Sequence, residues 1–142
     1  PDDFKYTALY DKIPQVKRLI DHFDLQTTRV RIHRQLPGQE IPLHTDGNNT
    51  AVKDKNDYMI RSITALTASK DFTYKFIDTE NKRRVQWLKQ GETIFFDPDL
   101  VAHGMSNEST TETRYALVQI FKLYPVTAWA RDFISTEKVV TI

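Results

Sequence analysis

The hydrophobic residues of this chain recur with two different periods. Between residues 10 and 23 they are spaced three and four apart, which predicts one face of an N-terminal helix with Pro14 in its first turn. From residue 29 onward the period is two, which is typical of strands with one apolar face. The strand candidates are rich in Ile, Val, Thr, Tyr and Phe, and they cover residues 29–36, 58–68, 72–77, 84–88, 92–97 and 114–123.

Short polar turns separate these strands, and no helical pattern alternates with them. This order argues against a parallel sheet and predicts two antiparallel sheets that face each other as a sandwich or barrel. The period-two pattern places five side chains in the interior: Ile32, Ile63, Phe95, Val118 and Ile120. The segment from Tyr124 onward has no clear period. We expect Trp129 and Phe133 to pack it against the barrel, with a second helix there as an alternative.

Length and composition indicate one globular domain. The chain has 142 residues, 39% hydrophobic and 27% charged, which predicts a single domain over 1–142 with its core at about 29–123. A net charge of +1 favours neither nucleic acid nor an anionic membrane as a partner, and no apolar run is long enough for a membrane span. The absence of cysteine excludes disulfides and Cys-ligated metals and fits a reducing compartment, so we expect a cytoplasmic protein.

Without cysteine, the ligands of any metal must be His, Asp or Glu. His44 and Asp46 are two positions apart, so in an extended chain both side chains point to the same side. His103, which follows the strand at 92–97 and opens a polar loop, is the candidate for a third ligand. Two imidazoles and one carboxylate form the facial triad that binds non-haem Fe(II) and leaves coordination positions open. A lone His-x-Asp also arises often by chance.

Arg114 lies 11 positions after His103, at the start of an apolar strand. By parity it shares a face with Val118 and Ile120. A guanidinium that points to an apolar interior needs an anion, and its planar fork suits a carboxylate. The alternative is a half-exposed Arg114 paired with a nearby glutamate.

The ordered set His44-x-Asp46, His103 and Arg114 resembles the Fe(II)/2-oxoglutarate-dependent oxygenase superfamily over roughly residues 30–121. Segments 36–43 and 91–97 look like the strands that lead to the two metal motifs in that family. The resemblance implies a mainly β fold, a double-stranded β-helix (jelly roll, cupin-like) with one N-terminal helix. It also implies that His44, Asp46 and His103 bind Fe(II), and that Arg114 binds the distal carboxylate of 2-oxoglutarate.

Within the superfamily the chain is similar to prolyl-hydroxylase-type enzymes and to the aspartyl/asparaginyl β-hydroxylase group. The second likeness rests on the order of Pro37-Gly38, Arg61, Trp87, Gly91, Phe95-Phe96-Asp97 and His103. Asp46 departs from that group, which often lacks the metal-binding carboxylate.

Two further residues are candidates for binding the cosubstrate. Arg61 lies by parity with Ile63 on the inner face of its strand, although a surface ion pair explains it equally well. Tyr58 has a hydroxyl that can donate to a carboxylate, although strand tyrosines more often only pack. His33 and Arg34 are candidates for lining a substrate pocket, and a paired sheet residue is the alternative for each.

The resemblance therefore implies an Fe(II)- and 2-oxoglutarate-dependent dioxygenase. It would use O₂ to hydroxylate an amino-acid side chain, free or in a peptide or protein, with release of succinate and CO₂. The first rival is a non-catalytic double-stranded β-helix that binds a metal or a small acid. The second rival is a metal enzyme of the same architecture that does not use 2-oxoglutarate.

Overall fold

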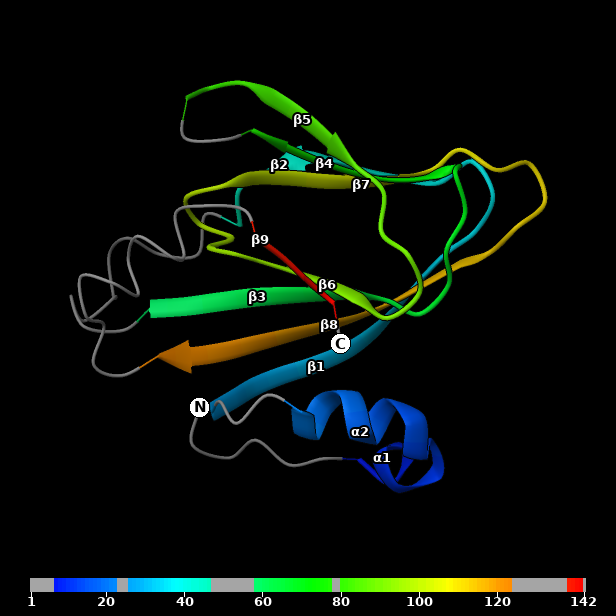
Figure 1. Cartoon of the computed structure of the whole chain (residues 1–142), viewed down its shortest axis with the longest axis vertical. Helices are drawn as coiled ribbons and strands as arrows, with labels where there is room; N and C mark the ends of the chain where they lie inside the picture. Colours follow the sequence, from blue (N-terminus) through cyan, green and yellow to red (C-terminus); the bar gives the residue numbers. More distant parts are fainter. Residues whose placement is uncertain (1–6, 23–25, 47–57, 78–79, 124–137, 142) are drawn as a thin grey trace.

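The computed structural model describes residues 7–22, 26–46, 58–77, 80–123 and 138–141 (Figure 1). Within these ranges there are two short helices, α1 (Leu9–Lys12) and α2 (Pro14–His22), followed by strands. The strands are β1 (Gln26–Gln35), β2 (Glu40–His44), β3 (Tyr58–Ala65), β4 (Phe72–Ile77), β5 (Arg83–Gln86), β6 (Glu92–Phe96), β7 (Ala102–Asn107), β8 (Arg114–Leu123) and β9 (Lys138–Thr141). No helix among the described residues is long and apolar enough to cross a membrane.

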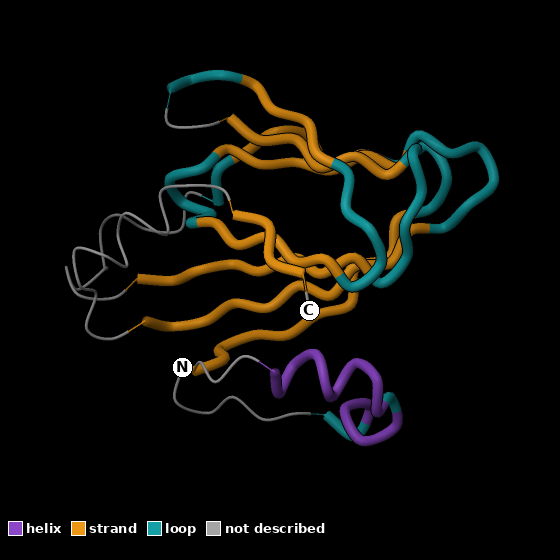
Figure 2. The backbone as a smooth tube through the Cα atoms, in the orientation of Figure 1, coloured by secondary structure: helices purple, strands orange, loops and turns teal. Residues whose placement is uncertain are grey.

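The strands form two antiparallel sheets that face each other, as Figure 2 shows. The larger sheet has the order β1-β8-β3-β6-β9, and the smaller sheet has the order β2-β7-β4-β5. From β1 to β8 consecutive strands alternate between the two sheets, except that β4 and β5 pair as neighbours within the smaller sheet, and this is the arrangement of a double-stranded β-helix, or jelly roll. The prediction of a mainly β fold with two facing antiparallel sheets is confirmed.

The space between the sheets holds the main apolar core. Ile63 of β3 and Val118 of β8 lie there with Phe76 of the smaller sheet, and each is at most 2% exposed. Ile120 is also buried on this inner face. Phe95 is buried as well, but it packs with Ile60 and Phe121 on the outer face of the larger sheet. Its predicted place in the interior is therefore wrong, because neighbouring residues of a strand point to opposite faces.

The inner face of β1 is polar. Arg29, Arg31 and His33 pair with the inward-facing Ile120, Val118 and Ala116 of β8, so their side chains point toward the smaller sheet. Ile32 lies on the outer face and is 38% exposed, which corrects its predicted place in the interior. The period-two pattern assigns the residues of β1 to its two faces correctly. The apolar face, however, is the outer one and does not face the smaller sheet. The helices lie on that side of the larger sheet (Figure 1).

Several element boundaries differ from the expected ones. The N-terminal helix is divided at Ile13, because a residue before proline is driven out of the helical conformation. His103 lies inside β7 rather than opening a loop, since β7 pairs with both β2 and β4. β9, which pairs with β6, was not predicted. Trp129 and Phe133, and the alternative helix near them, lie outside the described residues.

Candidate metal centre

Three side chains from two adjacent strands converge at one end of the barrel. His44 ends β2, Asp46 follows it by two residues, and His103 lies opposite His44 in the β2–β7 pairing. The Nε2 atoms of His44 and His103 lie 3.4 Å and 3.5 Å from Asp46 Oδ1. One ligand atom from each residue falls within 4.8 Å of the others. These are the three residues that the sequence indicated as metal ligands.

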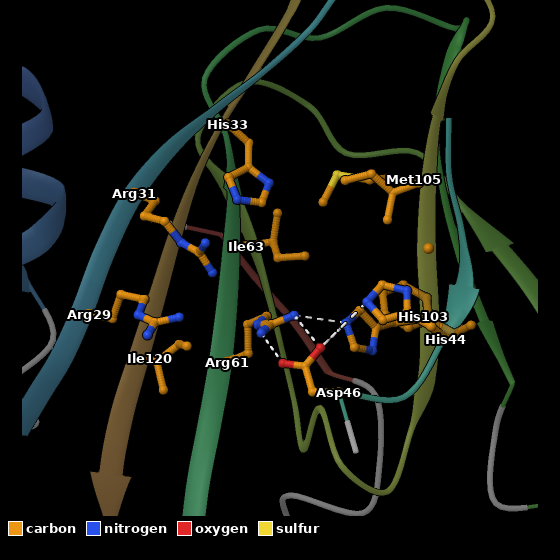
Figure 3. A pocket seen from close by; sticks show the side chains of 13 residues that line it. Arg29, Arg31, His33, His44, Asp46, Arg61, Ile63, His103, Met105 and Ile120 are labelled. Carbon is orange, nitrogen blue, oxygen red and sulfur yellow. Dashed lines mark hydrogen bonds and ion pairs between the residues drawn. The ribbon is translucent and has the colours of Figure 1, made fainter. Parts of the chain in front are cut away.

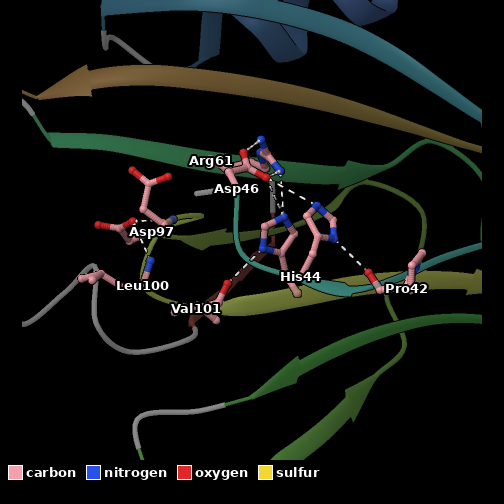
Figure 4. Close-up of polar contacts among 9 residues, drawn as sticks. Pro42, His44, Asp46, Arg61, Asp97, Leu100 and Val101 are labelled. Carbon is pink, nitrogen blue, oxygen red and sulfur yellow. Dashed lines mark hydrogen bonds and ion pairs between the residues drawn. The ribbon is translucent and has the colours of Figure 1, made fainter. Parts of the chain in front are cut away.

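Both imidazoles are oriented by backbone carbonyl groups (Figure 4). Nδ1 of His44 donates to the carbonyl oxygen of Pro42 at 2.8 Å, and Nδ1 of His103 donates to that of Val101 at 2.9 Å. A proton on each Nδ1 leaves each Nε2 with a lone pair that is directed at the cluster and can accept a hydrogen bond or bind a metal. Metal-binding histidines in proteins are fixed by hydrogen bonds of this kind.

The carbonyl group that orients His103 is itself held by a capped turn. The carboxylate of Asp97 accepts hydrogen bonds from the backbone N–H groups of Asp99 and Leu100 (Figure 4). The carbonyl oxygen of Asp97 accepts a hydrogen bond from the N–H of Val101. The carbonyl of Pro98 in the same turn accepts from the N–H of Asp46 at 2.9 Å. A single turn between β6 and β7 thus positions both His103 and Asp46.

Arg61 of β3 faces the cluster from the larger sheet. Its guanidinium forms an ion pair with the Asp46 carboxylate, and its Nη1 donates to Nε2 of His103 at 2.8 Å. Burial lowers the pKa of Arg61, and the carboxylate of Asp46 opposes that shift. Burial also lowers the pKa of His103 to about 4, with a contribution from Arg61. His103 is therefore neutral near pH 7, in the form that can bind a metal.

A cavity of about 300 Å³ opens beside this cluster, with its walls on both sheets (Figure 3). This volume is at the lower end of the range for small-molecule sites. Apolar side chains of both sheets, among them Ile63, Phe76 and Met105, form part of the wall. Arg29, Arg31 and His33 of β1 form another part. The sequence had indicated His33 but neither arginine, because the inner face of β1 was assigned to its apolar residues.

Arg34, the neighbour of His33, points the other way. It pairs with Tyr115 on the outer face of the larger sheet and is exposed. The pocket role that the sequence offered for Arg34 is therefore wrong, since its side chain lies on the opposite side of β1 from the cavity.

Arg114 lies deeper between the sheets and is 1% exposed. Its Nη1 donates to the side-chain oxygen of Gln35 and to the carbonyl oxygens of Thr73 and Ser106, at 3.1–3.2 Å. Its guanidinium carbon is 3.9 Å from the centre of the Tyr74 ring. Nε and Nη2 make no hydrogen bond to the described residues. The inward orientation agrees with the sequence pattern, and the exposed pairing with a glutamate does not occur.

The structure does not bring Arg114 into the same cavity wall as the His–Asp–His cluster. Arg114 pairs with Gln35 at one end of β1, and the row that contains Arg61 and Ile120 lies six residues further along β8. Arg114 Nη1 nevertheless contacts the carbonyl oxygen of Ser106, three residues along β7 from His103, and three residues of strand span roughly 10 Å. The backbone of Tyr58 begins β3, but its side chain lies outside the described residues, so its predicted contact stays a prediction.

The donor set suits a divalent metal ion. Two imidazole nitrogens and one carboxylate are the ligand types of a non-haem Fe(II) site, and they occupy one side of a cavity. The unsatisfied N–H groups of Arg114 likewise suit a carboxylate, because buried donors normally have partners. The chain thus has groups for a metal and for an organic acid.

Comparison with known proteins agrees with this arrangement. The sequence model for aspartyl/asparaginyl β-hydroxylases matches residues 2–122. No curated protein sequence matches the chain. A prolyl-4-hydroxylase from Pseudomonas putida is similar in structure with a TM-score of 0.54 and 14% identity, over 81% of this chain and 63% of that protein.

A second solved structure is similar to the same extent. It is an oxidoreductase of the 2OG-Fe(II) oxygenase family from Burkholderia pseudomallei, with a TM-score of 0.55 and 16% identity, over 78% of this chain and 50% of that protein. This chain spans less than two thirds of the length of either protein. At these identities the likeness shows a shared double-stranded β-helix fold.

Proposed function

Because this chain belongs to the aspartyl/asparaginyl β-hydroxylase family, we propose that it is an Fe(II)- and 2-oxoglutarate-dependent dioxygenase. It hydroxylates an amino-acid side chain, free or in a peptide or protein, and releases succinate and CO₂. The observation that carries this proposal is the convergence of two imidazole Nε2 atoms and one carboxylate at the edge of a cavity.

In this proposal His44, Asp46 and His103 hold the metal. Bound Fe(II) supplies the site where O₂ is activated and where oxidative decarboxylation of 2-oxoglutarate drives hydroxylation of the substrate. The carbonyl groups of Pro42 and Val101 keep both imidazoles in the metal-binding tautomer. Apolar residues of the cavity wall, such as Ile63 and Met105, limit the access of water to the reacting atoms.

Two arginines are available for the carboxylates of the cosubstrate. Two buried nitrogen atoms of Arg114, Nε and Nη2, make no hydrogen bond within the described part of the chain, which supports its proposed contact with the distal carboxylate. Arg61 now donates to Nε2 of His103. With a metal bound at Nε2, the N–H of Arg61 would no longer donate there and would be available to a carboxylate of the cosubstrate. Tyr58 completes the proposed set, as a donor from the start of β3.

The proposal is tested by anaerobic titration of the protein with Fe(II) and then 2-oxoglutarate, followed by ultraviolet-visible spectroscopy. We expect the metal-to-ligand charge-transfer band of an Fe(II)–2-oxoglutarate complex, and succinate after O₂ is admitted with a peptide substrate. Asp46→Ala removes a proposed ligand, whereas Glu40→Ala removes a carboxylate of β2, the strand that precedes Asp46, and Glu40 pairs with Lys75 outside the cavity. Only the first substitution is expected to abolish the band.

The rival functions give different results. Metal binding without the charge-transfer band indicates a metal enzyme that does not use 2-oxoglutarate. A band without succinate, for every amino acid and peptide tried, indicates a non-catalytic binding module.

A further inference from the structure

The proposed chemistry leaves two arginines of the cavity wall without a role. Arg29 and Arg31 point from β1 into the cavity, opposite the His–Asp–His cluster (Figure 3). Arg29 lies in the same row across the sheet as Ile120 and Arg61, and Arg31 lies in the next row with Val118 and Ile63. Both arginines are exposed, and neither forms a hydrogen bond or ion pair with the described residues.

The charges of this wall do not cancel. Three arginines line the cavity, and Asp46 is the only carboxylate among its lining residues that the structure describes. Asp46 is already paired with Arg61. Arg29 and Arg31 both lower the pKa of Arg61, after the larger effect of burial, and Arg31 lowers that of His33 in the same way. The wall therefore keeps an excess of positive charge that an incoming anion would relieve.

From this geometry we infer that Arg29 and Arg31 bind an acidic group of the substrate, so that the enzyme selects a carboxylate-bearing substrate over its neutral amide. Residues two apart on a strand place their side chains roughly 6–7 Å apart on one face. Two long guanidinium side chains at that spacing reach one carboxylate together, and each can donate two parallel hydrogen bonds. This inference rests on the proposed function, because it assigns the substrate class of the same site.

The carboxylate that binds Arg29 and Arg31 can come from the substrate or from the cosubstrate. The structure favours the substrate as its source. Arg29 is level with Arg61 and the proposed metal ligands, at the exposed edge strand of the larger sheet. Arg114, with its unsatisfied buried donors, lies at the other end of β8. A group that enters from solvent meets the exposed Arg29 and Arg31 first, whereas Arg114 is accessible only from within the barrel.

The test uses two pools of fluorescein-labelled heptapeptides that are identical except for a central Asp or Asn, with flanks randomised among neutral residues. Binding is measured by anisotropy to the full chain loaded with Mn(II) and 2-oxoglutarate under anaerobic conditions. We expect the Asp pool to bind at least about tenfold more tightly, as for charge-assisted hydrogen bonds to two arginines. Arg29→Gln/Arg31→Gln should remove this preference.

Arg34→Gln is the matched control, because Arg34 lies on the same strand with its side chain on the opposite face. It should keep the preference for Asp, and thermal unfolding of all variants checks that they are folded. Equal binding of the two pools, no binding of either pool at millimolar concentration, or a preference that survives the double substitution would overturn the inference. A double variant with weaker 2-oxoglutarate binding and an unchanged preference for Asp would assign the pair to the cosubstrate and overturn it too.

Turnover separates this inference from the proposed function. If the protein prefers the Asp pool through Arg29 and Arg31 but forms no succinate with Fe(II), 2-oxoglutarate and O₂, the acidic-group site stands and the proposed oxygenase activity fails. If succinate forms equally with both pools and binding shows no preference, the activity stands and the acidic-group site fails.

Discussion

Arg61 and Arg114 are both largely buried on the inner face of the larger sheet, but their guanidinium groups have different kinds of partner. Arg61 has a carboxylate partner within the chain, Asp46, and a second contact with His103. Arg114 has only neutral oxygens as partners, from Gln35 and two backbone carbonyl groups, and the face of an aromatic ring. Its Nε and Nη2 remain without hydrogen bonds to the described residues.

This difference in partners indicates which kind of ion each end of the barrel can bind. A buried charge is stable when it is paired, and an unpaired one raises the free energy of the folded state. At the Arg61 end the chain has both signs of charge, together with two imidazoles, so this end suits a cation that displaces the arginine. At the Arg114 end the chain has one sign only, so this end suits an anion from outside.

The largest expected effect comes from Asp46→Ala, which makes Arg61 resemble Arg114 by removing its carboxylate. Metal affinity should fall by more than about 100-fold, because even groups that only orient metal ligands contribute 10–100-fold. Loss of the partner of a buried charge should also lower the free energy of unfolding by about 3 kcal/mol. Fe(II) or Mn(II) titration and urea denaturation measure the two effects.

Glu40→Ala is the control for Asp46→Ala, since Glu40 lies on β2 but pairs with Lys75 and is half-exposed. It should leave metal affinity unchanged. Equal metal affinity in Asp46→Ala and wild type would remove Asp46 from the proposed ligand set.

The next effect comes from Arg114→Lys, which keeps the charge at the other end but removes the guanidinium fork. The apparent KM for 2-oxoglutarate should rise about 10- to 100-fold, while Fe(II) affinity stays the same. The measurements are succinate formation against 2-oxoglutarate concentration and a separate Fe(II) titration. Arg34→Lys, on the exposed outer face, is the control. An unchanged dependence on 2-oxoglutarate would contradict the role of Arg114.

The orientation of Arg114 could be predicted from the sequence, because residues two apart on a strand share a face and Arg114 has the parity of Ala116 and Val118 in the buried core. The same rule failed on β1. Alternation defines two faces but not which one is covered by the other sheet, and here Val30 and Ile32 lie on the side of the helices. The inner face of β1 is polar because it lines the cavity, so Arg29 and Arg31 were missed.

The contact between Gln35 and Arg114 could not be predicted from the sequence. Gln35 and Arg114 are 79 positions apart, and only the β1–β8 pairing brings them together. β7 contains His103-Gly104 and Ser106-Asn107, which favour loops by propensity, yet it is a central strand of its sheet. Pairing with β2 and β4 on both sides decides its conformation. The types of the candidate ligands, in contrast, were visible as His44-x-Asp46 and a later histidine.

A smaller effect is expected from Gly104→Ala on β7. This strand contacts Arg61 through His103 and Arg114 through Ser106. A Cβ at Gly104 would lie 2.7 Å from the carbonyl oxygen of Ile41, so β2 must move. We expect a loss of about 1–3 kcal/mol in the free energy of unfolding, and weaker metal binding because β2 carries His44. Arg114, which does not contact β2, should keep its effect on the KM for 2-oxoglutarate.

Gly38→Ala separates lost stability from a lost metal site. Gly38 has a φ of +74° but nothing within 4 Å of an added Cβ, so alanine there strains the backbone without displacing β2. Both variants should be less stable to urea, and only Gly104→Ala should bind Mn(II) more weakly. Equal metal affinities would show that the close approach of β2 and β7 is not needed for the centre.

The pH dependence of stability tests the Arg61 end by charge alone. Burial, with a smaller contribution from Arg61, lowers the pKa of His103 from 6.5 to about 4. The unfolded chain therefore binds a proton between these values that the folded chain does not. As a result the free energy of unfolding of the metal-free protein should rise with pH from about 4 to 6.5, by at most about 1.4 kcal/mol per pH unit for one proton. His103→Gln should reduce this slope, and His22→Gln, on the exposed surface of α2, should not. Urea denaturation at several pH values measures the slope. An equal slope in His103→Gln and wild type would mean that His103 is not held neutral beside Arg61.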